Sequence, residues 1–500
     1  MKKAKLTVDK RDVISEVDKR IYGSFVEHVG RGVYTGIYQP GHPEADEQGF
    51  RKDVLRLVKE LDVPIIRYPG GNFVSNYNWE DGVGPREERP KRLSLAWGTV
   101  EDNEIGLNEY SDWAKKSETE IMMAVNLGTR GIAEARDLIE YCNHPSGTYL
   151  SDLRIKHGYK DPHKIKVWCL GNEVDGPWQI GHKNADEYGR LVQETGKIMR
   201  LVDPSIETVA CGTVGHGMPT FGSWEETLLT EAYDNIDYMA IHCYYGNPGD
   251  DQSFLSMAEE MDRFIKAEAA LCDGMKAKLR KNKTLNISLD EWNVSYHINK
   301  FELDRWAKVQ PLLEEDYYFE DAVVMGTMMI TLINNADRVK MASLSSLVNT
   351  VAPIRTEING GAWRSMIYYP YLHASNFGRG TALRVETDAP KYSCANFKEL
   401  DSLYSAAVYN EEKGEISIFS VNRSITDDIE TQIDLRTFGN ISLIQALTFG
   451  SEDKKAINGP DESKNVVPVD IDRSGIKIEN GILTVELKKT TWNTIRVKIG

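Results

Sequence analysis

The chain has 500 residues, enough for two or three domains. It carries 76 Asp and Glu against 60 Lys and Arg, and this formal net charge of −16 disfavours nucleic acid and anionic membranes as partners. Hydrophobic residues make up 41% and charged residues 27%, so the composition predicts a globular protein and excludes disordered, collagen-like and coiled-coil classes.

The location of the protein is predicted from three features that the sequence lacks. No run approaches the ~18 consecutive apolar residues needed to span a bilayer, and no apolar stretch follows the lysines of the opening MKKAKLTVDKRDVISEV. The 6 cysteines are scattered and show no CxxC spacing, which is typical of reduced buried thiols rather than disulfides. We therefore expect a cytoplasmic protein without a membrane anchor.

Residues 18–382 alternate short apolar runs with longer stretches of helical period, the order expected of βαβ units. The predicted strands are Ile21–Val26, Pro64–Tyr68, Ile121–Asn126, Ile165–Leu170, Thr208–Cys211, Tyr238–His242, Ile287–Asp290 and Val339–Leu344. Repeats of this kind predict an α/β fold, a (β/α)8 TIM barrel. A doubly wound open sheet is the alternative, but no GxGxxG follows the first strand.

The remainder of the chain has a different pattern. Residues 383–500 alternate short strands with turn signals and show no helical period, which predicts a C-terminal antiparallel β-sandwich domain resembling a jelly roll. The N-terminal segment 1–17 contains the apolar run Ala4–Val8, and we expect it to join this sandwich. The predicted order is therefore an N-terminal strand segment, a catalytic barrel and a sandwich.

Two predicted barrel strands end in a glutamate. The fourth runs into Gly171-Asn172-Glu173 and the seventh into Asp290-Glu291-Trp292-Asn293. Barrel enzymes carry their functional residues at the C-terminal ends of the strands. A single strand-end Glu more often caps a helix or lies in a loop, but two carboxylates facing each other across a cleft are what glycosidic bond cleavage requires. The pair predicts a glycosidase.

Five short motifs make this prediction specific. They are GSFVEH at 23–28, RYPGGNF at 67–73, NEIGLNE at 103–109, GNE at 171–173 and DEWN at 290–293. In this order, and with similarity through essentially the whole chain, the sequence resembles the α-L-arabinofuranosidases of glycoside hydrolase family 51. The resemblance implies a cofactor-free, retaining exo-enzyme that acts on arabinan- or arabinoxylan-derived oligosaccharides. It also implies a homo-oligomer, a hexamer.

The resemblance also implies roles for individual residues. Glu173 is the general acid/base, and Glu291 is the nucleophile. Glu27, Asn72, Asn172 and Tyr244 bind the substrate, while Arg67 and His242 support the catalytic carboxylates. A retaining mechanism requires a raised pKa for the acid, and we expect a nearby anion and apolar surroundings to raise that of Glu173.

Several residues also have plainer interpretations. Pro69-Gly70-Gly71 on its own is a turn signal, and a lone His242 on a buried strand is more often a core residue. No HExxH or HxH motif suggests a metal site. The alternative functions are a related barrel glycosidase such as a β-xylosidase, a non-catalytic carbohydrate-binding barrel, and a Schiff-base aldolase, for which Lys340 lies at the wrong end of its strand.

Two positions depart from the family pattern. Ser295 stands where many members carry Trp, and Ser346 stands where many carry Gln. Both changes replace a larger side chain by a small hydroxyl. We therefore expect a wider and wetter substrate pocket.

Overall fold

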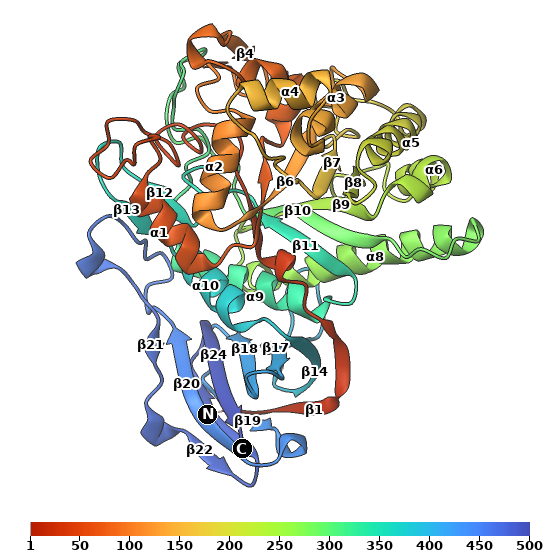
Figure 1. Ribbon diagram of the computed structural model, residues 1–500. Helices are drawn as coiled ribbons and strands as arrows, with labels where there is room; N and C mark the ends of the chain where they lie inside the picture. Colours follow the sequence, from red (N-terminus) through yellow and green to blue (C-terminus); the bar gives the residue numbers. More distant parts are fainter. Residues whose placement is uncertain (1) are drawn as a thin grey trace.

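Eight parallel strands close into a barrel in the computed structural model, which describes residues 2–500 (Figure 1). The strands are β2 (Gly23–Phe25), β3 (Ile65–Tyr68), β6 (Glu120–Val125), β7 (Val167–Leu170), β8 (Glu207–Cys211), β9 (Tyr238–Tyr245), β10 (Asn286–Val294) and β11 (Val339–Leu344). Each overlaps one predicted apolar run, so the (β/α)8 barrel is confirmed. Two of them, β9 and β10, extend three and four residues beyond the predicted ends.

The barrel is a packed core with an outer layer of helices. Side chains on alternate strand positions, among them Ile65, Met122, Val167 and Val209, fill its interior. The helices are α1 (Lys52–Leu61), α2 (Leu107–Ser117), α3 (Ile132–Asn143), α4 (Tyr149–Lys156), α5 (Ala185–Val202), α6 (Ser223–Ala232), α7 (Asp251–Phe254), α8 (Met257–Lys278), α9 (Phe319–Asn334) and α10 (Tyr368–Phe377). No helix within residues 2–500 is both long and apolar enough to cross a membrane.

The rest of the chain builds a ten-stranded sheet that curls around its own apolar core. Its strands, in spatial order, are β21 (Val469–Asp470), β20 (Ile441–Phe449), β24 (Thr491–Ile499), β18 (Glu415–Asn422), β17 (Leu403–Asn410), β14 (Thr381–Asp388), β1 (Lys2–Glu16), β19 (Ile429–Asp434), β23 (Ile482–Leu487) and β22 (Lys477–Glu479). The sheet-rich C-terminal domain is thus present. One pairing is not antiparallel, because β1 runs parallel to β19.

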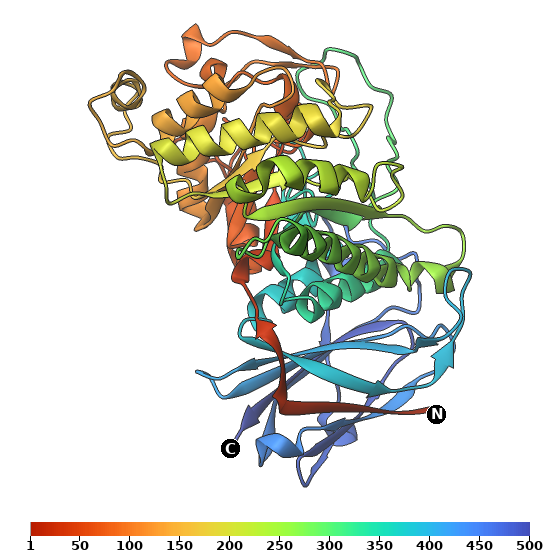
Figure 2. The ribbon, with the colours of Figure 1, turned by 90° about the vertical axis from the view of Figure 1, so that its right-hand side faces the viewer.

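The first strand, β1, and the last strand, β24, both belong to this sheet, and β1 leads from it up into the barrel (Figure 2). It pairs with β14 on one side and β19 on the other, with register shifts between Val8 and Ser15 that bend the strand. Since β14 begins at Thr381, the sheet starts slightly before residue 383. The division of the chain at 17 and 382 stays a prediction.

Helix α9 joins the two units. Nearly all of its residues are buried, because the barrel packs on one side and strands β17, β18 and β24 pack on the other. Gly326 provides the space for this contact, since a methyl group there would lie 2.5 Å from the ring of Trp492. The sheet domain therefore packs against the barrel through α9.

Candidate active site

A register shift in β10 brings two neighbouring carboxylates into the barrel. Adjacent residues of a regular strand point to opposite faces. The pairing of β10 with β9 is irregular between Ser288 and Glu291, and consequently both Asp290 and Glu291 contact Arg67 in the interior. The sequence predicted Glu291 but not the part played by Asp290.

Glu173 reaches the same space from the end of β7. The strand ends at Leu170, and Gly171 follows with φ at +101°, a conformation that favours glycine. Glu173 itself has φ at +43°, so the chain turns sharply around it. Its carboxylate accepts hydrogen bonds from His242 Nδ1 at 2.9 Å and from Trp178 Nε1 at 2.8 Å.

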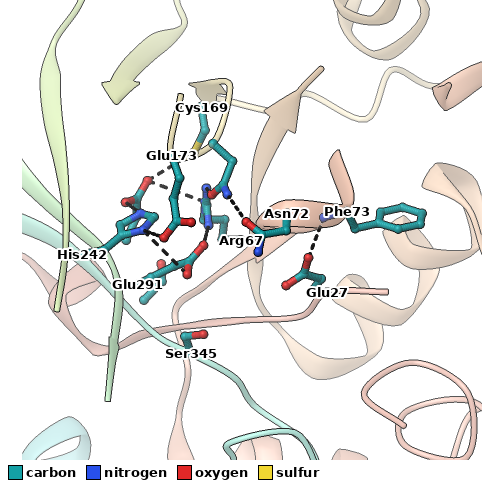
Figure 3. A network of polar contacts seen from close by, with 12 residues as sticks. Glu27, Arg67, Asn72, Phe73, Cys169, Glu173, His242, Glu291 and Ser345 are labelled. Atoms are coloured by element: carbon teal, nitrogen blue, oxygen red, sulfur yellow. Dashed lines mark hydrogen bonds and ion pairs between the residues drawn. The ribbon is translucent and has the colours of Figure 1, made fainter. Parts of the chain in front are cut away.

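His242 connects the carboxylates to one another (Figure 3). Its Nε2 lies 3.0 Å from Asp290 Oδ1, and its Nδ1, besides the contact with Glu173, lies 3.7 Å from Glu291 Oε2. Burial alone would lower the pKa of His242, but the three carboxylates, Glu291 foremost, raise it well above its usual value. The surrounding carboxylates therefore favour the imidazolium form of this ring.

The contacts of His242 also change the pKa expected for Glu173. Burial would raise the pKa of Glu173, yet the hydrogen bond and the positive charge of His242 outweigh burial and lower it. The prediction that the pKa of Glu173 is raised is therefore wrong. These opposite shifts favour the proton on His242, whose Nδ1 lies 2.9 Å from Glu173 Oε1.

Arg67, fully buried on β3, supports the other side of the site. Its guanidinium donates to Glu291 Oε1 at 2.7 Å and to Asn172 Oδ1 at 2.8 Å. The amide of Asn172 in turn donates to Asn72 Oδ1 at 3.2 Å. Of the two asparagines, Asn72 lines the cavity, whereas Asn172 lies behind it and orients its neighbours.

Tyr244 and Glu27 complete the wall around Glu291. The hydroxyl of Tyr244 donates to Glu291 Oε2 at 2.8 Å and lies 2.8 Å from Ser345 Oγ. Glu27 Oε1 accepts from the backbone N–H of Phe73 at 2.8 Å and from Trp97 Nε1 at 3.0 Å. Burial, and next the charge of Glu291, raises the pKa of Glu27 to about 8.

Most of these groups line one cavity of about 700 Å³ at the C-terminal end of the barrel strands. The predicted residues Glu27, Asn72, Glu173, Tyr244 and Glu291 line it, as does His242. Trp97 and Trp178 also line it, and their indole N–H groups hold carboxylates; the sequence could not distinguish this role from ordinary packing. Ser345 was not predicted, because nothing in its local sequence marks it.

The two departures from the family pattern have different environments. Ser346 lines the cavity, in agreement with a wider pocket on that side. Ser295 does not: it is 3% exposed, and its hydroxyl donates to the buried carboxylate of Glu315 at 3.1 Å. The expectation that Ser295 widens the pocket is therefore wrong.

Ser295→Trp is accordingly expected to lower the stability of the protein. An indole in this filled space must displace its neighbours and removes a donor from Glu315, a cost of about 1–3 kcal/mol in the free energy of unfolding. Urea denaturation checks this value. Ser346→Gln is the matched control, since its side chain extends into the cavity. Equal denaturation midpoints for Ser295→Trp and the wild type would contradict the assigned environment.

A metal ion is the other group this cluster could hold. Glu173, His242 and Glu291 each offer a ligand atom within 4.8 Å of the others. However, both ring nitrogens of His242 already lie at hydrogen-bond distance from carboxylates, so an ion would have to displace Glu173 or Asp290. The arrangement favours acid–base chemistry between carboxyl groups.

The chain matches two family models, the α-L-arabinofuranosidase 1 domain over residues 57–267 and the α-L-arabinofuranosidase C-terminal domain over residues 290–490. It is 56% identical to the intracellular exo-α-(1→5)-L-arabinofuranosidase 1 of Bacillus subtilis (strain 168), over 100% of this chain and 99% of that protein. An exo-α-(1→6)-L-arabinofuranosidase of Bifidobacterium longum is 45% identical, over 100% and 98% of the two chains.

Solved structures agree with these matches. A family 51 α-L-arabinofuranosidase from Bifidobacterium longum superposes with a TM-score of 0.95 at 40% identity, covering 99% of each chain. Fold and sequence thus agree with these relatives along the full length of the chain. The chain belongs to the α-L-arabinofuranosidases of glycoside hydrolase family 51.

Proposed function

We propose that this glycoside hydrolase is an intracellular, retaining exo-α-L-arabinofuranosidase, which removes terminal arabinofuranosyl units from arabinan- or arabinoxylan-derived oligosaccharides. The observation that carries the proposal is the spacing of the two carboxyl groups. Oxygens of Glu173 and Glu291 lie within 4.8 Å of each other in one cavity. Retaining glycosidases hold their carboxyl groups about 5 to 5.5 Å apart, whereas inverting enzymes need about 6.5 to 9.5 Å to admit a water.

In the first half of the reaction, Glu291 attacks the anomeric carbon while Glu173 protonates the departing oxygen. Arg67 and Tyr244 fix the Glu291 carboxylate for this attack, each through one oxygen. Bond formation removes the charge of Glu291. In the second half, Glu173 as carboxylate takes a proton from water, and the resulting hydroxide replaces Glu291 at the anomeric carbon.

The proton for the first half comes from the pair of Glu173 and His242. Transfer along the 2.9 Å hydrogen bond converts imidazolium and carboxylate into neutral imidazole and carboxylic acid. Asp290 keeps the opposite nitrogen of His242 protonated through a 3.0 Å contact, and this fixes the tautomer. His242 is therefore a positioning residue that also stores the acid's proton.

The test is hydrolysis of defined arabino-oligosaccharides, with the first product observed by NMR. We expect arabinose released one unit at a time as the α-anomer before mutarotation. Initial release of the β-anomer would overturn the retaining mechanism, and release of internal fragments would overturn the exo mode. Because the relatives are named for both (1→5) and (1→6) linkages, the same reaction with both linkages determines the preference of this chain.

Nitrophenyl glycosides separate the alternatives. Greater activity on the β-D-xyloside than on the α-L-arabinofuranoside would favour the β-xylosidase, and binding without turnover would favour a non-catalytic barrel. The aldolase has no support from the site, since Lys340 Nζ bonds to Ser15 and Ala336 away from the cavity. We also propose a homo-oligomer, a hexamer, on the family resemblance; light scattering of the purified protein tests it.

A further inference from the structure

The active site holds more carboxyl groups than its cations can neutralise. Four carboxyls, those of Glu27, Glu173, Asp290 and Glu291, are buried or nearly buried around the cavity. The cations among them are the guanidinium of Arg67 and the imidazolium of His242. Were all four carboxyls ionised, two charges would remain uncompensated in a region of low dielectric constant, at a high cost.

The contacts of the cations decide which carboxyl lacks a partner. Arg67 bonds to Glu291 and lies 3.6 Å from Asp290, while His242 bonds to Asp290 and Glu173. Within residues 2–500, Glu27 receives only neutral donors, the N–H groups of Phe73 and Trp97, and both bind the same oxygen, Oε1. Among the described residues, none donates to Oε2.

The free oxygen of Glu27 points towards Glu291. A methyl group placed on Gly71 would lie 3.1 Å from Glu27 Oε2 and 2.9 Å from Glu291 Oε1, so these two oxygens flank one small space. Glu27 also lines the cavity, where the sugar must lie to reach Glu291. A proton on Oε2 removes the repulsion across Gly71 and supplies a donor directed into the cavity.

We propose that Glu27 works as a neutral carboxylic acid, which donates a hydrogen bond from Oε2 to an oxygen of the bound arabinofuranosyl unit. The proposal rests on the function proposed above and adds the protonation state of one residue. Of the other titratable groups that face Glu27, Glu291 favours the proton and Arg67 opposes it. His28, its neighbour in the chain, bonds instead to Glu101 and Tyr68.

The hydrogen bond donated by protonated Glu27 should make the activity depend on pH. Burial and Glu291 place the pKa of Glu27 at about 8, so the donor is lost in mildly alkaline solution. The acid/base Glu173 produces an alkaline limb of its own, which hides this loss in the wild type. A leaving group that needs no protonation, combined with Glu173→Gln, removes the contribution of Glu173 and exposes Glu27.

The experiment measures kcat/KM of Glu173→Gln on 2,4-dinitrophenyl α-L-arabinofuranoside between pH 5 and 10. We expect a fall above about pH 8, approaching tenfold per pH unit. Adding Glu27→Gln should abolish the fall, because the amide donates at every pH. The matched control is the double variant that combines Glu173→Gln with Glu260→Gln. Glu260 lines the same cavity from α8 but pairs with His216, so the fall in kcat/KM above about pH 8 should persist in this variant.

Persistence of the limb in the variant with Glu27→Gln would overturn the proposal and assign the titration to His242. A kcat/KM of Glu173→Gln that does not change between pH 5 and 10 would also overturn the proposal. Tyr244 does not compete at this pH, because burial, and next Glu291, raises its pKa well above 10. If the wild type hydrolyses no arabinofuranoside at any pH, the proposed function fails instead, so the two failures are distinguishable.

Discussion

Glu291→Ala is expected to lower kcat on every arabinofuranoside by on the order of 10⁴- to 10⁶-fold, because no glycosyl-enzyme can form. Both oxygens of Glu291 are engaged, by Arg67 at 2.7 Å and by Tyr244 at 2.8 Å, so removing the carboxylate leaves a space directly opposite the leaving group. Azide is small enough to enter it. We expect added azide to restore turnover and to give a glycosyl azide of inverted configuration.

The fall in kcat of Glu291→Ala must be distinguished from unfolding of this variant. Arg67 would remain buried without one of its two anionic neighbours, at a cost to stability. Thermal denaturation of Glu291→Ala and of Glu291→Gln, which keeps the shape of the side chain, measures this cost. A folded Glu291→Ala that still hydrolyses dinitrophenyl arabinofuranoside at more than about one hundredth of the wild-type rate would remove Glu291 from the role of nucleophile.

The loss of activity in Glu173→Ala is expected to depend on whether the leaving group of the substrate needs a proton. Cleavage of an oligosaccharide should slow by about 10²- to 10⁴-fold, because its departing oxygen needs a proton. A dinitrophenyl group departs as the anion, so the first half of the reaction should proceed and the glycosyl-enzyme should accumulate. A burst of dinitrophenol followed by slow turnover is the measurement that checks this.

The product formed with azide distinguishes Glu173→Ala from Glu291→Ala. Without Glu173, water lacks its general base, but azide needs none and attacks the glycosyl-enzyme from the side that the leaving group has vacated. The product should be a glycosyl azide of retained configuration. An inverted product here, together with a retained one from Glu291→Ala, would exchange the two roles. His242→Gln is a useful companion, since it should reduce acid catalysis while leaving the nucleophile in place.

The sequence by itself determined the barrel, its strands and the two strand-end glutamates. Short apolar runs and helices of period 3.6 are local patterns, and a barrel brings the C-terminal ends of all its strands to one face whatever the loops do. Glu173 and Glu291, 118 positions apart, therefore could be expected to face each other before any contact was known. The strand-end positions of Glu27, His242 and Tyr244 follow from the same rule.

Only the tertiary structure determined the directions of the pKa shifts and the orientations of several side chains. The pKa of Glu173 is lowered rather than raised because His242, from a different strand, donates to it. The register shift that turns Asp290 inward depends on the pairing of β10 with its neighbours, and Ser295 faces Glu315 instead of the cavity. Each of these features arises from groups far apart in the chain whose distance, burial and charge no local pattern encodes.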